Sequence, residues 1–205
     1  VVLCHKPAQL ETVAEEIAGR AQAVASVLAG TTISALQAAY PDTPVFALMP
    51  NTPVEVRRGV ICYAPAPGVP AELESQVVAL FERVGRVETV DERLLLLAST
   101  VTGVGPAYDA LVVEAQVDAA VRLGLSAPLA GRLVVETMVG TAALLAARGY
   151  DTLAVRREVT SPGGVTARGL AALERAGLRS AFQAANDAVL QWGCLLYTSD
   201  AADDL

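Results

Sequence analysis

The sequence of 205 residues is poor in the side chains that most often carry hydrolytic or metal chemistry. It has one histidine, His5, so a Ser-His-Asp or Cys-His mechanism would have to use that residue. Its three cysteines, Cys4, Cys62 and Cys194, lie far apart and form no CxxC pair. This spacing argues against a disulfide framework and a zinc knuckle, and it fits a reducing cytoplasm.

Basic charge is also scarce. Fifteen Lys and Arg face 22 Asp and Glu, which gives a net charge of -7. We therefore expect neither nucleic acid nor an anionic membrane as the main partner. Aromatic residues make up 4% and hydrophobic residues 53%, so the core must consist mostly of Ala, Val and Leu, in one domain or two small ones.

Two apolar stretches, residues 94–113 and 127–147, were tested as membrane spans. The first contains Asp109, and the second carries Arg132 and Glu136 near its middle. A spanning helix has few or no charges, so we expect buried helices of a soluble, cytoplasmic protein and no membrane partner. No signal peptide is expected, and the chain opens on an apolar strand as if entered in the middle.

Residues 1–93 alternate between strand and helix patterns. The predicted strands are 1–4, 23–29, 45–49, 59–64 and 85–90, and the predicted helices are 8–20, 32–40 and 71–84. This alternation predicts a mainly parallel sheet with helices on its faces. Ligands of such sheets bind beyond the carboxyl ends of the strands, which here are followed by the loops 5–7, 29–31 and 50–53.

Residues 94–192 predict an all-α region. The predicted helices are 106–123, 126–148, 151–159, one that ends at 176, and 180–192, with Ser126, Asp151 and Ser180 as N-caps. The segment before residues 102–108 is interpreted as a linker, and residues 102–108 as a hinge that lets the long helix pack closely. Helix 106–123 is apolar on nearly every side, so we expect this region to bury itself against a second copy of the chain. Residues 193–205 lack periodicity and are interpreted as a non-native tail.

Residues 161–166, Ser-Pro-Gly-Gly-Val-Thr, form the most distinctive motif. Two glycines before a helix free backbone N–H groups that suit a small anion such as a carboxylate, and Ser161 and Thr166 add hydroxyls. The alternative is a plain turn between helices.

Other polar residues have equally ordinary explanations. Asn51 and Thr52 follow a buried strand and could instead form a simple turn. Lys6 could meet a phosphate or be a surface lysine, and Cys62 is expected to be a small core residue. Residues 102–108 match neither GxGxxG nor GxxxxGK[ST].

Taken in order, residues 6–7, 29–33, 49–53, 102–108 and 159–166 resemble the pyrroline-5-carboxylate reductase family. The likeness extends over about residues 1–192. It implies an NADPH- or NADH-dependent oxidoreductase that reduces 1-pyrroline-5-carboxylate to L-proline in proline biosynthesis. It also implies a partial Rossmann-type domain over 1–93, a helical dimerisation and substrate domain over 94–192, and a homodimer that in many members assembles into a decamer.

The resemblance also implies roles for single residues. Ser161, Gly163 and Gly164 would hold the substrate carboxylate, and Thr166 would hydrogen-bond the ring nitrogen and help deliver its proton. Lys6, Pro7, Asn51 and Thr52 would line the dinucleotide and nicotinamide side. No metal is required.

The sequence departs from the family pattern in two places. Val104 stands where family members usually have serine, and the GxGxxG loop that binds the pyrophosphate is absent. We therefore expect the chain to be a fragment that lacks the first βαβ portion and is weakly active or inactive alone. Two alternatives remain: a related reductase of another imine or keto acid, and a non-catalytic dimerisation module.

Overall fold

The computed structural model describes residues 1–17 and 19–198, and the chain divides into two compact units. The first unit comprises residues 1–106 and the chain from Ala188 onward, and the second comprises residues 107–187. The first unit extends past residue 93 because helix α4 (Glu92–Thr102) packs on the sheet through the buried Leu95.

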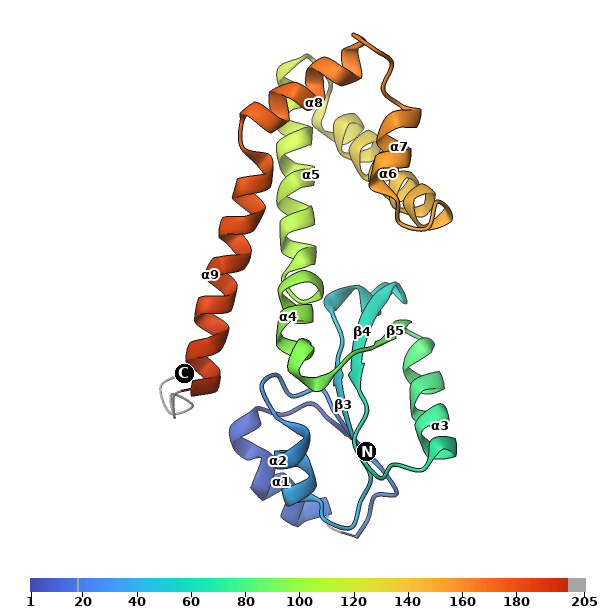
Figure 1. Ribbon diagram of the computed structural model, residues 1–205, viewed down its shortest axis with the longest axis vertical. Coiled ribbons are helices and arrows are strands. Elements are labelled where there is room, and N and C mark those ends of the chain that lie inside the picture. The colour runs from blue at the N-terminus through green and yellow to red at the C-terminus, as the bar shows by residue number, and fades with distance from the viewer. Residues whose placement is uncertain (18, 199–205) are drawn as a thin grey trace. The chain divides into compact units, whose positions relative to one another are not determined.

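A single five-stranded sheet forms the centre of the first unit, in the order β1-β2-β3-β4-β5 (Figure 1). The strands are β1 (Val2–Leu3), β2 (Val24–Ser26), β3 (Val45–Met49), β4 (Gly59–Ala64) and β5 (Gly85–Thr89). All neighbouring pairs are parallel except β3 and β4, which are antiparallel. The prediction of a mainly parallel sheet is confirmed.

Both faces of this sheet are buried, which explains why its strands are almost continuously apolar. Along β3, Val45 and Ala47 belong to one hydrophobic cluster, whereas Phe46 and Leu48 belong to the other. Successive side chains of a strand point to opposite faces, so each strand contributes to both clusters.

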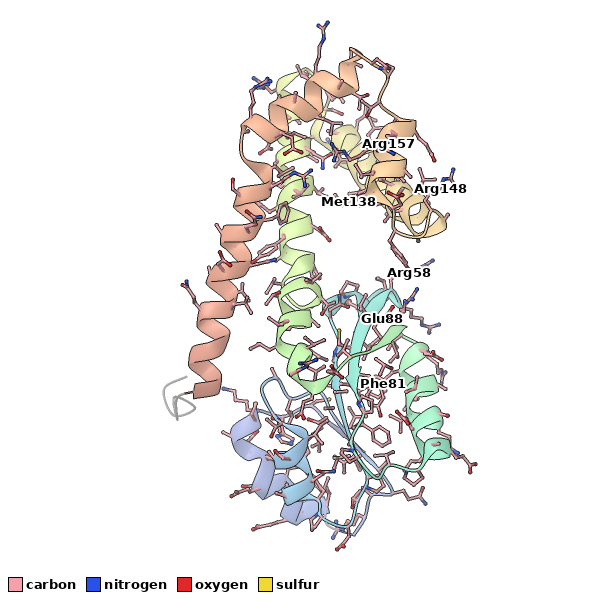
Figure 2. All side chains as sticks on the ribbon, in the orientation of Figure 1. Arg58, Phe81, Glu88, Met138, Arg148 and Arg157 are labelled. Atoms are coloured by element: carbon pink, nitrogen blue, oxygen red, sulfur yellow. The ribbon has the colours of Figure 1, made fainter. Side chains whose placement is uncertain are left out.

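Helices cover both faces of the sheet (Figure 1). They are α1 (Leu10–Ile17), α2 (Ile33–Ala39) and α4 on one face and α3 (Ala71–Glu82) on the other. Phe81 of α3 packs against the cluster that contains Phe46 and Leu48 (Figure 2). The two 3-10 helices, η1 (Pro7–Gln9) and η2 (Thr52–Val56), follow β1 and β3 directly.

Helix α4 corrects the interpretation of this segment as a linker. Its second half is rich in Ser and Thr, which favour non-helical conformations in short peptides. Here their hydroxyls donate to carbonyls of the preceding turn, Ser99 to Leu96 at 2.6 Å and Thr102 to Ala98 at 3.1 Å. These bonds leave the helix intact, and its apolar side chains hold it against the sheet.

The second unit is helical, as predicted. Its helices are α5 (Gly105–Arg122), α6 (Ala127–Ala147), α7 (Thr152–Glu158), α8 (Val165–Arg175) and α9 (Leu178–Thr198), of which α5 and α9 extend beyond the unit. Asp151 is the N-cap of α7, because its carboxylate accepts from the Ala154 N–H at 2.9 Å. Ser126 precedes α6 without a side-chain capping bond.

Ser180 is not the N-cap of the last helix. Helix α9 already begins at Leu178, and the Ser180 hydroxyl donates to the Gly177 carbonyl at 2.8 Å. The helix also continues to Thr198, beyond its predicted end at residue 192. Of the predicted tail over 193–205, residues 199–205 lie outside the described residues.

Side-chain contacts between helices organise the second unit. The rings of Tyr108 on α5 and Phe182 on α9 meet edge to face at 6.3 Å between centroids. Arg148, at the end of α6, forms an ion pair with Glu158 of α7 at 2.9 Å (Figure 2). These two contacts join helices of the second unit, but many of the apolar side chains on these helices remain exposed.

Two stretches, Glu92–Arg122 and Ala127–Ala147, are long and apolar enough to cross a membrane by length and composition alone. Core helices of soluble proteins pass the same test, but here only 6% of each most apolar window is buried within the chain. Leu111, Leu133 and Val139 are among the exposed side chains. An apolar surface of this extent marks an interaction surface.

Candidate functional site

The carboxyl ends of β1, β2 and β3 meet at one edge of the sheet, because these three strands are parallel. Lys6 and Pro7 follow β1, and both are exposed. The Lys6 N–H donates to the Gln9 side chain at 3.3 Å, and Pro7 begins η1. The Lys6 ammonium forms no ion pair with the described part of the chain, so it is available to an anionic ligand.

Asn51 and Thr52 follow β3 at the same edge. Asn51 is half-buried, and its carboxamide is already engaged at both ends. Its Nδ2 donates to the Thr102 carbonyl at 3.0 Å, and its Oδ1 accepts from the Val60 N–H at 2.8 Å. Thr52 is exposed at the first position of η2.

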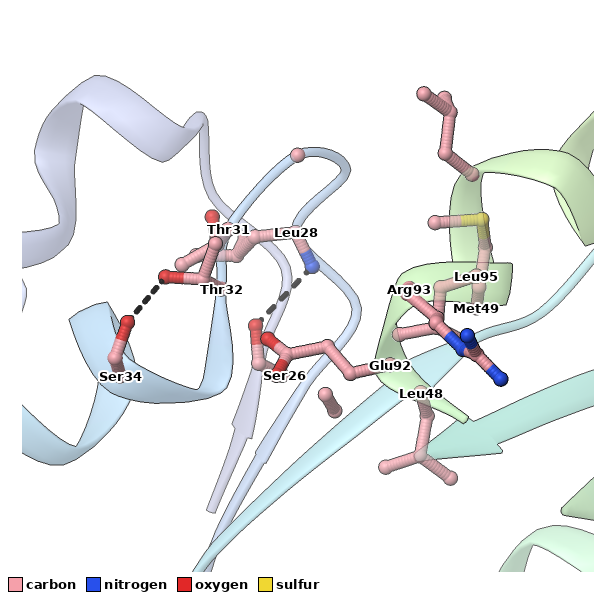
Figure 3. A pocket seen from close by; sticks show the side chains of 13 residues that line it. Ser26, Leu28, Thr31, Thr32, Ser34, Leu48, Met49, Glu92, Arg93 and Leu95 are labelled. Carbon is pink, nitrogen blue, oxygen red and sulfur yellow. Dashed lines mark hydrogen bonds between the residues drawn. The ribbon is translucent and has the colours of Figure 1, made fainter. Parts of the chain in front are cut away.

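A cavity of about 480 Å³ opens at this edge beside β2 and β3 (Figure 3). Leu28, Met49 and Leu95 give it apolar walls, and Thr31 and Thr32 add hydroxyls. A flat ring with one polar edge suits such a mixture of apolar walls and a few polar groups.

Glu92 also lines this cavity, and no sequence motif singles it out. Its Oε1 accepts from the Ile33 N–H at 2.6 Å, where α2 begins, and Thr32 caps the same helix by accepting from the Ala35 N–H at 3.1 Å. Ile33 and Glu92 lie 59 positions apart in the sequence, so no local pattern predicts this bond.

The loop at residues 161–164 leads into α8 in the second unit. Gly163 has φ +70°, in the left-handed region that favours glycine. Gly164 is the N-cap of α8, and its N–H donates to the Ser161 carbonyl at 3.0 Å. A β-carbon on Gly164 would overlap the Ser161 hydroxyl, so glycine is required for the observed position of that hydroxyl.

This loop presents the groups that a carboxylate needs. Ser161 is exposed, and Thr166 is half-buried in the first turn of α8. The N–H groups of the first helical turn point away from the helix body, and the helix dipole adds partial positive charge there. The structure therefore brings Ser161, Gly163, Gly164 and Thr166 together at one helix N-terminus.

Positive charge lies next to this loop. Arg156, Arg157 and Thr160 line a cavity of about 210 Å³ together with Leu153 and Leu170. The Arg-Arg pair just before residues 160–166 is the signal in the sequence that could have pointed to it. The predicted dinucleotide residues thus lie in the first unit, and the predicted substrate residues in the second.

Burial governs the properties of Cys62, which is 3% exposed and belongs to the core, as predicted. Burial raises the pKa of its thiol, a hydrogen bond with the Thr102 side chain lowers it, and nearby Glu88 raises it further. Burial also raises the pKa of Tyr63, whose hydroxyl donates to Glu74 of α3 at 2.9 Å.

A mainly parallel sheet flanked by helices with polar loops at its carboxyl edge, together with a separate apolar helical unit, defines a Rossmann-type dinucleotide-binding protein with a helical domain. Residues 92–192 match the family model described as "Pyrroline-5-carboxylate reductase dimerisation". This match covers the helices whose apolar faces are exposed in the single chain, and it supports assembly into homo-oligomers.

Curated relatives and solved structures agree with this match. Pyrroline-5-carboxylate reductase from Synechocystis sp. is 38% identical over 88% of this chain and 68% of its own length. The Mycobacterium tuberculosis enzyme is 39% identical over 90% of this chain and 72% of its own length.

The structure of the Coxiella burnetii enzyme has a TM-score of 0.89 at 30% identity, covering 97% of this chain and 76% of that one. The Plasmodium falciparum enzyme, solved with NADP bound, has a TM-score of 0.83 at 27% identity, covering 96% and 76%. The chain belongs to the pyrroline-5-carboxylate reductase family, whose members are NAD(P)H-dependent oxidoreductases.

Proposed function

We propose that the protein reduces 1-pyrroline-5-carboxylate to L-proline, with the ring held at the loop of residues 161–166. The observation that carries the proposal is the Ser161–Gly164 turn at the start of α8. The Ser161 hydroxyl and the free N–H groups of the first turn of α8 suit one small carboxylate. Charge-assisted hydrogen bonds of this kind are about twice as strong as neutral ones.

Thr166 is the residue proposed to act on the ring nitrogen. Reduction adds a hydride to the carbon of the C=N bond, and the nitrogen receives a proton, so the imine becomes a secondary amine. The Thr166 hydroxyl would hydrogen-bond the nitrogen and help deliver that proton. Orientation supplies much of the rate, because the carboxylate contacts at one end of the ring fix the C=N bond at the other.

The sheet edge of the first unit fits the nicotinamide side of a dinucleotide. NAD(P)H supplies the hydride. We propose that Lys6, Pro7, Asn51 and Thr52 line this side, since they follow two parallel strands at their carboxyl ends. The apolar walls and hydroxyls of the nearby cavity add to the fit. The sequence contains no GxGxxG motif, so the chain offers no such loop to the pyrophosphate.

We further propose a partial Rossmann-type dinucleotide domain over 1–93, a helical dimerisation and substrate domain over 94–192, a homodimer through that domain, assembly of such dimers into a decamer, and a cytoplasmic location. The exposed apolar side chains of α5 and α6 support the dimer, because burying them against a second copy removes them from water. Light scattering during size-exclusion chromatography would measure the assembly directly.

Turnover by the full-length protein, followed as NADPH or NADH oxidation with 1-pyrroline-5-carboxylate, tests the proposal, because we expect the chain alone to be weakly active or inactive. We expect Thr166→Ala to lower kcat and to leave the oligomer unchanged. Oxidation with another cyclic imine or a keto acid, but none with 1-pyrroline-5-carboxylate, would indicate a related reductase. A stable oligomer of the full-length protein that oxidises neither cofactor with any of these substrates would contradict the proposal and favour a dimerisation module.

A further inference from the structure

Helix α4 is held to the first unit by a hydrogen bond at each end. At its start, the Glu92 carboxylate accepts from the Ile33 N–H at 2.6 Å. At its end, the Thr102 carbonyl accepts from Asn51 Nδ2 at 3.0 Å. The last four carbonyls of an α-helix have no partner within the helix, so the Asn51 carboxamide satisfies a group that would otherwise need water.

The same carboxamide also bonds to the sheet. Its Oδ1 accepts from the Val60 N–H of β4 at 2.8 Å. Because a carboxamide donates at one end and accepts at the other, one side chain joins β4, the loop after β3 and the end of α4. Aspartate keeps the acceptor for Val60 but cannot donate to Thr102 when ionised, so Asn51→Asp separates the two bonds.

A buried thiol lies under this fastening. Cys62 of β4 stands opposite Met49 in the antiparallel pair, and it belongs to the same hydrophobic cluster as Leu95 of α4. It is 3% exposed, whereas Cys4 is exposed. Release of the end of α4 would therefore uncover Cys62, which makes that thiol a reporter of the fastening.

We propose that Asn51 is a positioning residue that fastens the carboxyl end of α4 to the sheet edge where the cofactor is proposed to bind. Thr102 lies just before the end of the first unit at Pro106. The fastening therefore fixes the point from which the chain leaves that unit, and the helices that carry Ser161 and Thr166 follow it in the sequence. Its value for the reaction rests on the proposed function, since hydride transfer is sensitive to small errors of position.

Thiol labelling tests the fastening without any need for turnover. Cys4→Ser and Cys194→Ser together leave Cys62 as the one thiol in the sequence. With Ellman's reagent in excess, we expect Asn51→Ala and Asn51→Asp to raise the rate of Cys62 labelling about tenfold or more over this background. Glu55→Ala, at an exposed position of η2, is the matched control and should leave the rate unchanged.

Two labelling results would overturn the proposal. One is an unchanged rate in Asn51→Ala. The other is an unchanged rate in Asn51→Asp beside a raised rate in Asn51→Ala, because the Val60 bond alone would then keep α4 in place.

Kinetics separate positioning from direct cofactor contact. In the full-length protein we expect Asn51→Asp to lower kcat about tenfold, whatever its effect on the KM for NADPH at the proposed cofactor edge. A raised KM with an unchanged kcat would identify a cofactor contact instead and overturn the positioning role. If labelling is as expected but the full-length protein shows no turnover, the fastening stands and the proposed function fails, so the two can be told apart.

Discussion

The Ser161 hydroxyl occupies the place that a β-carbon on residue 164 would take, and Gly164 leaves that place free. The clash involves the end of a side chain that can rotate, so an added methyl group would move the hydroxyl rather than unfold the loop. Substitution of Gly164 should therefore move the Ser161 hydroxyl with little effect on the stability of the fold.

We expect Gly164→Ala to raise the KM for 1-pyrroline-5-carboxylate about tenfold, which corresponds to the loss of one hydrogen bond to a charged group. The melting temperature should change by only a few degrees. Steady-state kinetics and thermal unfolding of the same preparation check both parts. Gly169→Ala, in the same helix with open space around its added carbon, is the control and should leave KM unchanged.

Substitution of Gly85 is expected to destabilise the fold, because the added carbon would meet backbone atoms rather than a side chain that can rotate. It pairs with Gly59 across β5 and β4, and a β-carbon on it would overlap the Gly59 carbonyl group. We expect Gly85→Ala to lower the free energy of unfolding by about 1–3 kcal/mol, as overpacked sites do. Thr89→Ala, at the exposed end of the same strand, should have a smaller effect in denaturant titrations.

The caps of α6 and α7 provide a matched pair. Asp151 accepts from the Ala154 N–H, whereas Ser126 makes no side-chain capping bond. We expect Asp151→Ala to cost about 1 kcal/mol of stability and Ser126→Ala to cost clearly less. Equal losses of unfolding free energy in the two variants would show that the hydrogen bond of the Asp151 side chain adds nothing to the stability of α7.

Tyr63 should make the protein lose stability at high pH. Burial and the hydrogen bond to Glu74 raise its pKa above the ordinary value of about 10. Above pH 10 the unfolded chain releases this proton while the folded chain keeps it, so the free energy of unfolding falls as pH rises toward the folded pKa. Below pH 10 this contribution is fully present.

We expect Tyr63→Phe to make that fall less steep by at most about 1.4 kcal/mol per pH unit. Unfolding measured in guanidinium chloride between pH 8 and pH 11 checks this. Glu74→Gln removes the neighbouring charge but not the burial, so its effect should be smaller. An identical pH profile in the Tyr63 variant would contradict the assignment.

The sheet was predictable from the sequence where its strands are buried on both faces. β3 and β4 have the bounds that their apolar runs between Pro and Gly predict. The bounds of helix α4 were not predictable in this way, because its packing on the sheet is not recorded in its local sequence pattern.

The candidate site likewise has one part that is visible in the sequence and one part that is not. The loop at residues 161–166 stands out locally, because two adjacent glycines before a helix can be recognised in the sequence, although a plain turn between helices has the same pattern. The bonds of Glu92 to Ile33 and of Asn51 to Thr102 join residues more than 50 positions apart. Such partners depend on how the chain folds back, and no motif in the sequence records them.

The open apolar faces of α5 and α6 have a consequence for how stable this protein is. If a second copy covers them, folding of the helical unit and association become one equilibrium, and stability is no longer a property of one chain. The unfolding midpoint then rises with protein concentration by mass action. Dilution alone, with no change of temperature, pH or sequence, would loosen the half of the molecule that carries Ser161 and Thr166.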